Sequence, residues 1–81
     1  MPTVCFNPIN NSLIFSSVDF VCFAYTIYDC KENIVCDGML NISRDHTETI
    51  FIPENTIGEY SVIIDINGLL YRGEFEIEEV F

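Results

Sequence analysis

Basic side chains are nearly absent from this chain of 81 residues. Lys31, Arg44 and Arg72 stand against thirteen aspartates and glutamates, and the formal net charge at pH 7 is −10. Affinity for phosphate surfaces depends on clustered lysine and arginine, so this composition disfavours DNA, RNA and anionic membranes as partners. We expect a solvated acidic surface, which favours cationic partners over anionic ones.

Long apolar runs, repeats and low-complexity segments are also missing. No stretch has the length of a membrane-spanning helix, and the N-terminus lacks the basic region and apolar stretch of a signal peptide. Four glycines and three prolines are too few for a low-complexity linker, while hydrophobic residues make up 49% of the chain. This content is typical of a packed core, so we expect residues 1–81 to form one domain.

Alternation of apolar and polar residues dominates the sequence, and no segment keeps a helical period for three turns. The clearest strand has aromatic and β-branched residues on one side and smaller residues on the other. The predicted strands are Thr3–Phe6, Ser12–Ser16, Phe20–Tyr28, Ile34–Ile42, Thr47–Ile52, Tyr60–Ile66 and Leu69–Ile77. Seven short strands at roughly 8–12-residue spacing predict an all-β fold, a small two-sheet antiparallel sandwich of the immunoglobulin-like kind.

The strongest local signal is Asn67-Gly68, which lies between two apolar strands. Asparagine and glycine readily adopt the two positive φ angles that a two-residue type I′ hairpin needs. The turn predicts four pairs on one side of the hairpin: Ile66 with Leu69, Ile64 with Tyr71, Val62 with Gly73 and Tyr60 with Phe75. We expect this side to lie in the core, with Gly73 marking a bulge or the close approach of another backbone.

The cysteines lack the spacing of a metal or redox motif. Cys5, Cys22, Cys30 and Cys36 include no Cys-x-x-Cys pair, which argues against a zinc knuckle or a thioredoxin-type site. Four cysteines allow three complete pairings, and spacing alone does not choose among them. If Tyr28 pairs with Ile34, the facing pairs are Cys36 with Thr26 and Cys22 with Leu40. No two cysteines then lie within bridging distance, so free thiols are favoured over structural disulfides.

Several segments together resemble a known family. The start of one strand, Gly58-Glu59-Tyr60, is similar to the Gly-x-Tyr start of the penultimate strand in immunoglobulin-like sandwiches. Four further segments follow the order found in a family of short, secreted, uncharacterised Bacteroidetes proteins: Ile27–Asp29, Asn33–Val35, Ile50–Pro53 and Gly73–Ile77. The resemblance implies an immunoglobulin-like sandwich, an extracytoplasmic location with the signal peptide outside this sequence, no known catalysis and no cofactor. Family members tend to have glycine in the turn 29–33, whereas this chain has Cys-Lys-Glu-Asn at 30–33. Asn33 tolerates a left-handed conformation better than most residues.

Residue types that support catalysis are scarce. His46, the one histidine, follows Asp45 and lies near Ser43 in a predicted loop, where neighbours rarely aim at one another as a triad requires. Cys22 and Cys36 lack the basic neighbours that lower a thiol pKa and create a nucleophile. We therefore expect His46 to be a solvated loop residue and the chain not to be an enzyme, with neither a catalytic site nor a metal.

Glu74, Glu76 and Glu78 form the most distinctive surface pattern. Alternate residues of a strand point to the same side about 6.8 Å apart, and two such charges repel in water by only about 0.6 kcal/mol. The favoured interpretation is that a row of like charges discourages sheets from pairing edge to edge. The alternative is an acidic patch for a divalent cation or a basic partner, although calcium sites usually draw oxygens from a tight loop.

A second candidate surface is the outward side of the sheet that holds the strands at 20–28, 60–66 and 69–77. Its residues are more apolar than the solvent side of an isolated domain needs, which is typical of a contact surface. We expect a partner face at Tyr28, Ile63, Leu70 and Arg72. A second copy of the chain, another protein or an adjoining domain would each satisfy it.

These observations predict a non-enzymatic, extracytoplasmic interaction or structural module whose partner is left open. One alternative is a small inhibitor that inserts loops into an enzyme such as a protease, with Asn7–Asn11, Arg44–His46 and Pro53–Thr56 as candidate loops. Another is a weak calcium-binding surface protein. The fold by itself does not choose among these functions.

Overall fold

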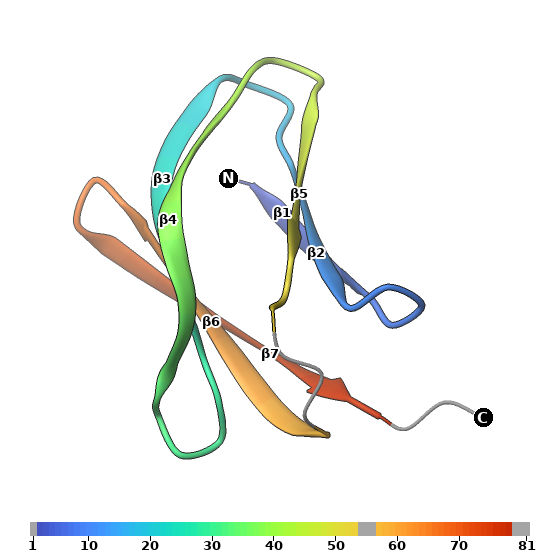
Figure 1. Ribbon diagram of the computed structural model, residues 1–81. Coiled ribbons are helices and arrows are strands. Elements are labelled where there is room, and N and C mark those ends of the chain that lie inside the picture. Colours follow the sequence, from blue (N-terminus) through green and yellow to red (C-terminus); the bar gives the residue numbers. More distant parts are fainter. Residues whose placement is uncertain (1, 54–56, 79–81) are drawn as a thin grey trace.

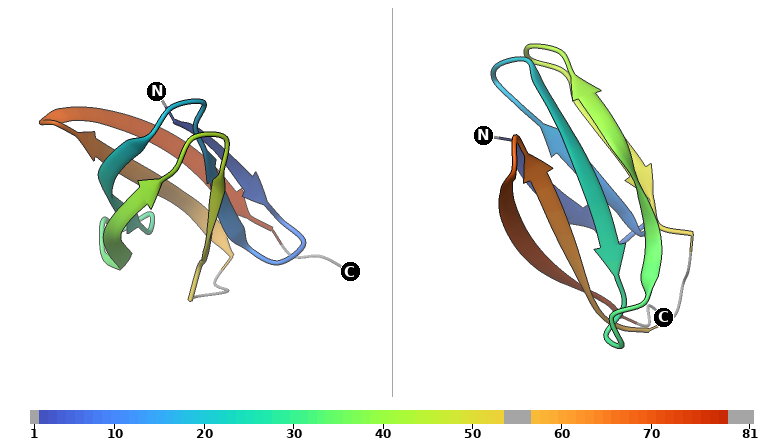
Figure 2. Two further views of the ribbon diagram at one scale, coloured as in Figure 1. Left: turned by 90° about the horizontal axis from the view of Figure 1, so that it is seen from above. Right: turned by 90° about the vertical axis from the view of Figure 1, so that its left-hand side faces the viewer.

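Seven β-strands form two antiparallel sheets in the computed structural model, which describes residues 2–53 and 57–78 (Figure 1). The strands are β1 (Thr3–Asn7), β2 (Ser12–Ser16), β3 (Val21–Tyr28), β4 (Ile34–Ile42), β5 (Thr47–Phe51), β6 (Gly58–Ile66) and β7 (Leu69–Ile77). One sheet has the order β1-β2-β5 and the other β4-β3-β6-β7. The right-hand view of Figure 2 shows the four-stranded sheet in front of the three-stranded one.

This architecture confirms the predicted all-β sandwich. β2, β4 and β7 have the predicted bounds, and the other strands differ from the prediction by one or two residues at one end. The prediction succeeds because the alternation of apolar and polar residues follows the alternation of buried and exposed positions. Phe23, Tyr25 and Ile27 of β3 all lie in the core. No helix able to cross a membrane occurs among the described residues.

The core lies between the two sheets. Its buried apolar residues are Leu13, Phe15, Phe23, Tyr25, Ile27, Ile42, Ile52, Tyr60, Val62, Ile64 and Ile77. At one side, Phe75 of β7 stacks on Phe6 of β1 and on Tyr60 of β6, with ring centroids 4.8 and 5.5 Å apart. Each such pair contributes about 0.5–1.5 kcal/mol beyond burial, and this ring column joins the two sheets.

The β6–β7 hairpin turns at Asn67-Gly68 as predicted. Asn67 has a φ of 53° and Gly68 a φ of 85°, the positive values of a type I′ turn. The backbone N–H of Gly68 also donates a hydrogen bond to Asp65 Oδ1 at 2.9 Å. All four predicted pairs are present, from Ile66 with Leu69 to Tyr60 with Phe75.

Two expectations for β7 are wrong. Leu69 and Tyr71 were expected in the core, but they are 62% and 36% exposed. The three-stranded sheet has strands of five residues, whereas β6 and β7 have nine, so the hairpin tip extends past the facing sheet (Figure 1). Gly73 is not a bulge, because the β6–β7 register continues through it. It lines a cleft of about 180 Å³ between β1 and β7.

A β-bulge changes the predicted pairing of β3 with β4. Tyr28 pairs with Ile34 as expected, but the register shifts between Ile27 and Tyr28 because β4 contains one extra residue there. The predicted pairs Cys36–Thr26 and Cys22–Leu40 are therefore wrong by one residue, and the observed pairs are Cys36–Ile27 and Cys22–Asn41. All four cysteines are free, as predicted.

Candidate partner-binding face

The outward side of the four-stranded sheet carries the candidate site. Cross-strand partners lie on the same side of a sheet, so the registers arrange these residues in rows. In the order β4, β3, β6, β7 the rows are Met39-Ala24-Asp65-Leu70, Asp37-Thr26-Ile63-Arg72 and Ile34-Tyr28-Ser61-Glu74. Glu59 and Glu76 form a further pair across β6 and β7. We call this surface the outer face.

An open hollow of about 690 Å³ lies over the outer face. Tyr28, Ile63 and Arg72, three of the four residues predicted for the partner face, line this hollow. Tyr28 and Ile63 are half-buried and supply its apolar surface. The other lining residues are Asp29, Cys30, Glu32, Glu59, Tyr60, Ser61, Glu74, Phe75 and Glu76.

Negative charge dominates the hollow. Its carboxylates belong to Asp29, Glu32, Glu59, Glu74 and Glu76, whereas its one lining cation is Arg72. Arg72 Nε lies 3.5 Å from Glu74 Oε1, and both side chains are exposed, so this ion pair contributes little to stability. The excess of carboxylates creates a local field that attracts a positively charged group.

The turn between β3 and β4 forms one rim of the hollow, and the Asp29 carboxylate holds that turn together. Asp29 Oδ1 accepts hydrogen bonds from the backbone N–H groups of Lys31 and Asn33, both at 2.9 Å. The hydrogen bond from the Asn33 N–H is the main cause that lowers the pKa of Asp29 below its ordinary value. The left-handed residue of this turn is Glu32, with a φ of 64°, and not Asn33.

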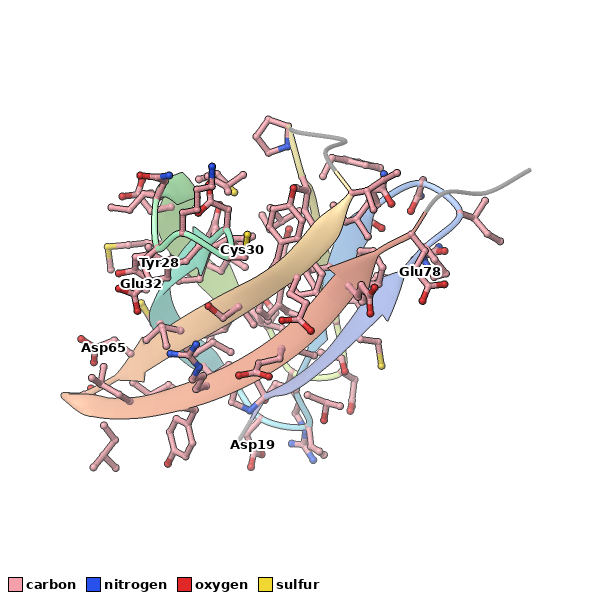
Figure 3. All side chains as sticks on the ribbon, turned by 90° about the horizontal axis from the view of Figure 1, so that it is seen from below. Asp19, Tyr28, Cys30, Glu32, Asp65 and Glu78 are labelled. Carbon is pink, nitrogen blue, oxygen red and sulfur yellow. The ribbon has the colours of Figure 1, made fainter. Side chains whose placement is uncertain are left out.

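Figure 3 shows how the acidic residues are distributed around the sheet. Cys30 and Glu32 lie beside Tyr28 at one end, Asp65 lies at the hairpin tip and Glu78 lies apart from both. The predicted acidic patch is therefore divided, because Glu74 and Glu76 line the hollow and Glu78 does not. Leu70 also lies outside the hollow and is 68% exposed, so it extends the outer face towards the tip.

Sequence reasoning missed Asp29, Glu32 and Glu59 as parts of this surface. Aspartate at the start of a short connection, with asparagine four residues later, is a sequence signal for an ordered turn. That signal predicts the turn but not its position beside β6. Glu59 could have been found from the hairpin register, which pairs it with Glu76.

No catalytic or metal-binding arrangement assembles within residues 2–53 and 57–78. No three His, Cys, Asp or Glu side chains come together in a way that could hold a metal ion. His46 is an exposed loop residue, as predicted, and its backbone N–H donates to the Ser43 carbonyl oxygen at 3.1 Å. Burial, followed by the charge of Asp37, raises the pKa of the Cys36 thiol and disfavours the nucleophilic thiolate.

The loops considered for an inhibitor do not share one end of the sandwich, as far as the described residues place them. The Ile52 N–H donates to the Asn11 carbonyl oxygen at 2.9 Å, which joins the start of the loop after β5 to the β1–β2 turn. Asp45, in the loop 44–46, donates its N–H to the Ser17 carbonyl oxygen at 3.2 Å, just past the other end of β2. Residues 54–56 of the third loop lie outside the described residues. The loops Asn7–Asn11 and Arg44–His46 lie near opposite ends of β2 and therefore do not form one inserting surface.

The fold is shared with a protein of known crystal structure. A DUF3244 family protein from Bacteroides vulgatus, described as having an immunoglobulin-like β-sandwich fold, matches this chain with a TM-score of 0.73. This chain is an immunoglobulin-like β-sandwich. The match covers 95% of this chain and 84% of the other at 22% sequence identity, a level at which the likeness establishes the fold alone.

The origin of this sandwich neighbour in Bacteroides agrees with the family that the sequence resembles. No protein-family model and no curated protein matches the chain. The immunoglobulin-like sandwich serves many unrelated functions, so the function has to be argued from the outer face itself.

Proposed function

We propose that this chain is a non-enzymatic binding module that acts outside the cytoplasm and binds a protein partner through the outer face. The observation that carries the proposal is the hollow, in which half-buried Tyr28 and Ile63 lie among five carboxylates. The apolar residues gain from contact with a partner, and the carboxylates select its charge. The sequence resemblance to secreted proteins supports the extracytoplasmic location.

The chemistry of the hollow favours a partner segment that combines a basic residue with an apolar one. A lysine or arginine of the partner would face the carboxylates of Glu59, Glu74 or Glu76. Complementary charge of this kind mainly raises the association rate and the specificity, and both fall as ionic strength rises. Nucleic acids and anionic membranes carry the wrong charge for this surface.

Site-specific photo-cross-linking tests the outer face. A photoreactive phenylalanine derivative replaces Ile63 in one protein and Thr49 in the control, because Thr49 pairs with Ile14 on the outward side of the three-stranded sheet. Each protein is incubated with the secreted and envelope fractions of the source organism. We expect a discrete cross-linked product from position 63, absent from position 49 and weakened by high salt.

The identity of the cross-linked product separates the possible partners. A structural or envelope protein would support the proposal, whereas an enzyme inhibited by the chain would support the inhibitor alternative. Equal products from positions 63 and 49, or no product from position 63, would contradict the outer face as the binding surface. No contact among the described residues specifically favours the inhibitor or the calcium-binding alternative.

A further inference from the structure

β7 is an open edge of the four-stranded sheet and the most regular long edge in the described residues. Its nine residues pair with β6 in one unbroken register, and among the described residues no strand is hydrogen-bonded to its other side, which borders the cleft towards β1. The edge strands β1 and β5 have only five residues, and the bulge interrupts the edge strand β4. A long, regular, open edge is a template for pairing with another strand.

The hairpin determines which backbone groups of β7 face this open edge. A two-residue turn makes Ile66 and Leu69 a hydrogen-bonded pair, and hydrogen-bonded and non-hydrogen-bonded pairs then alternate along the hairpin. The odd-numbered residues of β7 therefore direct their N–H and C=O groups to β6. Arg72 and Glu74 direct theirs to the open edge, where a new strand can bind them.

We propose that β7 pairs antiparallel with β7 of a second copy of this chain, about a two-fold axis between the two Gly73 residues. In this register Arg72 of each copy faces Glu74 of the other, and these residues exchange backbone hydrogen bonds across the interface. The charges are complementary because Arg72 and Glu74 flank Gly73 with opposite signs. Gly73 has no side chain, so the strands meet at the axis without crowding.

The same register covers the apolar residues that a single chain leaves exposed. Leu69 and Tyr71, which are 62% and 36% exposed, face Ile77 and Phe75 of the second copy. Aromatic and aliphatic side chains directly opposite one another are favourable cross-strand pairs. Phe75 and Ile77 are packed against the facing sheet of their own chain, so the contact covers the hairpin tip, which that sheet does not reach.

The charge pattern of β7 selects this register against its neighbours. A shift of two residues in one direction places Glu74 opposite Glu74, and a shift in the other places Arg72 opposite Arg72. Like charges directly opposite destabilise a strand pair. In the proposed register like charges meet only diagonally, at about 7–8 Å. The register centred on Glu74 also places Arg72 opposite Glu76, but it keeps the Glu74–Glu74 contact. Of these three registers, only the proposed one pairs unlike charges with no like charges directly opposite.

Substitutions that reverse the charges at positions 72 and 74 test the pairing. Association is measured by sedimentation equilibrium, over protein concentrations from micromolar to millimolar. The wild type is expected to show a monomer–dimer equilibrium. Arg72→Glu and Glu74→Arg each place like charges opposite one another, so each should raise the dissociation constant about tenfold or more. The double variant exchanges the two charges and should recover the association of the wild type.

A mixture of the two single variants gives the sharpest result. One copy then carries two acidic side chains at positions 72 and 74 and the other carries two basic ones. Both facing pairs across the axis are therefore of opposite charge and attract. We expect the mixture to form a heterodimer under conditions in which each variant alone is monomeric. Circular dichroism establishes that every variant is folded.

Arg44→Glu is the matched control, because it changes the net charge as Arg72→Glu does but lies in the β4–β5 loop. It should leave the association unchanged; an equal loss would show an effect of overall charge and overturn the proposal. A wild type that stays monomeric at millimolar concentration, or a mixture that fails to associate, would also overturn it. Cross-linking from Ile63 does not depend on this edge, so the proposed function is tested separately.

Discussion

At the scale of single residues, two glycines of edge strands show why a glycine is hard to interpret from sequence. The sequence predicts a bulge or a close approach at Gly73, but the structure places the close approach at Gly38 of β4. A Cβ atom at Gly38 would lie 2.9 Å from Tyr25 Oη and 3.1 Å from two carbons of its ring, whereas at Gly73 it would meet only Val62 Cγ1 at 3.4 Å. The residue type is the same, and only the packing distinguishes the two sites.

Gly38→Ala and Gly73→Ala should therefore change stability in opposite directions. Replacing a strand glycine by alanine gains about 0.5–1 kcal/mol of unfolding free energy where space exists, as at Gly73. At Gly38 the methyl group overpacks a buried ring, which costs about 1–3 kcal/mol, for a net loss of about 1 kcal/mol. Urea unfolding of both variants at low protein concentration measures the difference. Equal stability of the two variants would show that Tyr25 moves aside freely.

At the scale of elements, the two hairpins of the four-stranded sheet differ in how far sequence predicts them. Asn67-Gly68 fixes the β6–β7 register locally, because a two-residue turn leaves no freedom in pairing. The connection 29–33 between β3 and β4 is longer, and the bulge follows it directly. No residue there signals the extra position in β4, so the predicted register fails by one residue.

Gly68→Ala measures how strongly the turn conformation determines the β6–β7 hairpin. No atom lies within 4 Å of a Cβ at Gly68, so the effect comes from its φ of 85° alone. An L-residue in this left-handed conformation should lose about 1–2 kcal/mol of unfolding free energy. Chemical synthesis with D-alanine at position 68 is the matched control, because a D-residue favours positive φ and should restore stability. If both substitutions cost the same, the turn conformation is not the cause.

At the scale of the whole molecule, the sequence predicts the two layers. It does not predict how the sheets are offset or which strands are neighbours within a sheet. Alternation assigns a side to each residue within a strand. It does not reveal that β3 pairs with β6, which places Tyr28 beside Ser61 and creates the hollow. It also does not reveal that the hairpin tip extends past the shorter sheet. Pairing between distant strands has no local signature, and the outer face depends on it.

The net charge of −10 makes the folded chain repel itself. Raising NaCl from about 10 mM to about 150 mM shortens the screening length from about 30 Å to about 8 Å, which is less than the radius of gyration of 12.5 Å. Repulsion across the molecule then weakens, so we expect the unfolding free energy to rise. A gain of about 1 kcal/mol raises the Tm by about 4–8 °C. A Tm that falls with salt would show that attractive ion pairs outweigh the repulsion.

CaCl₂ and MgCl₂ at equal ionic strength are the matched controls and should act alike. A larger increase with CaCl₂, reversed by a chelator, would instead support the calcium-binding alternative.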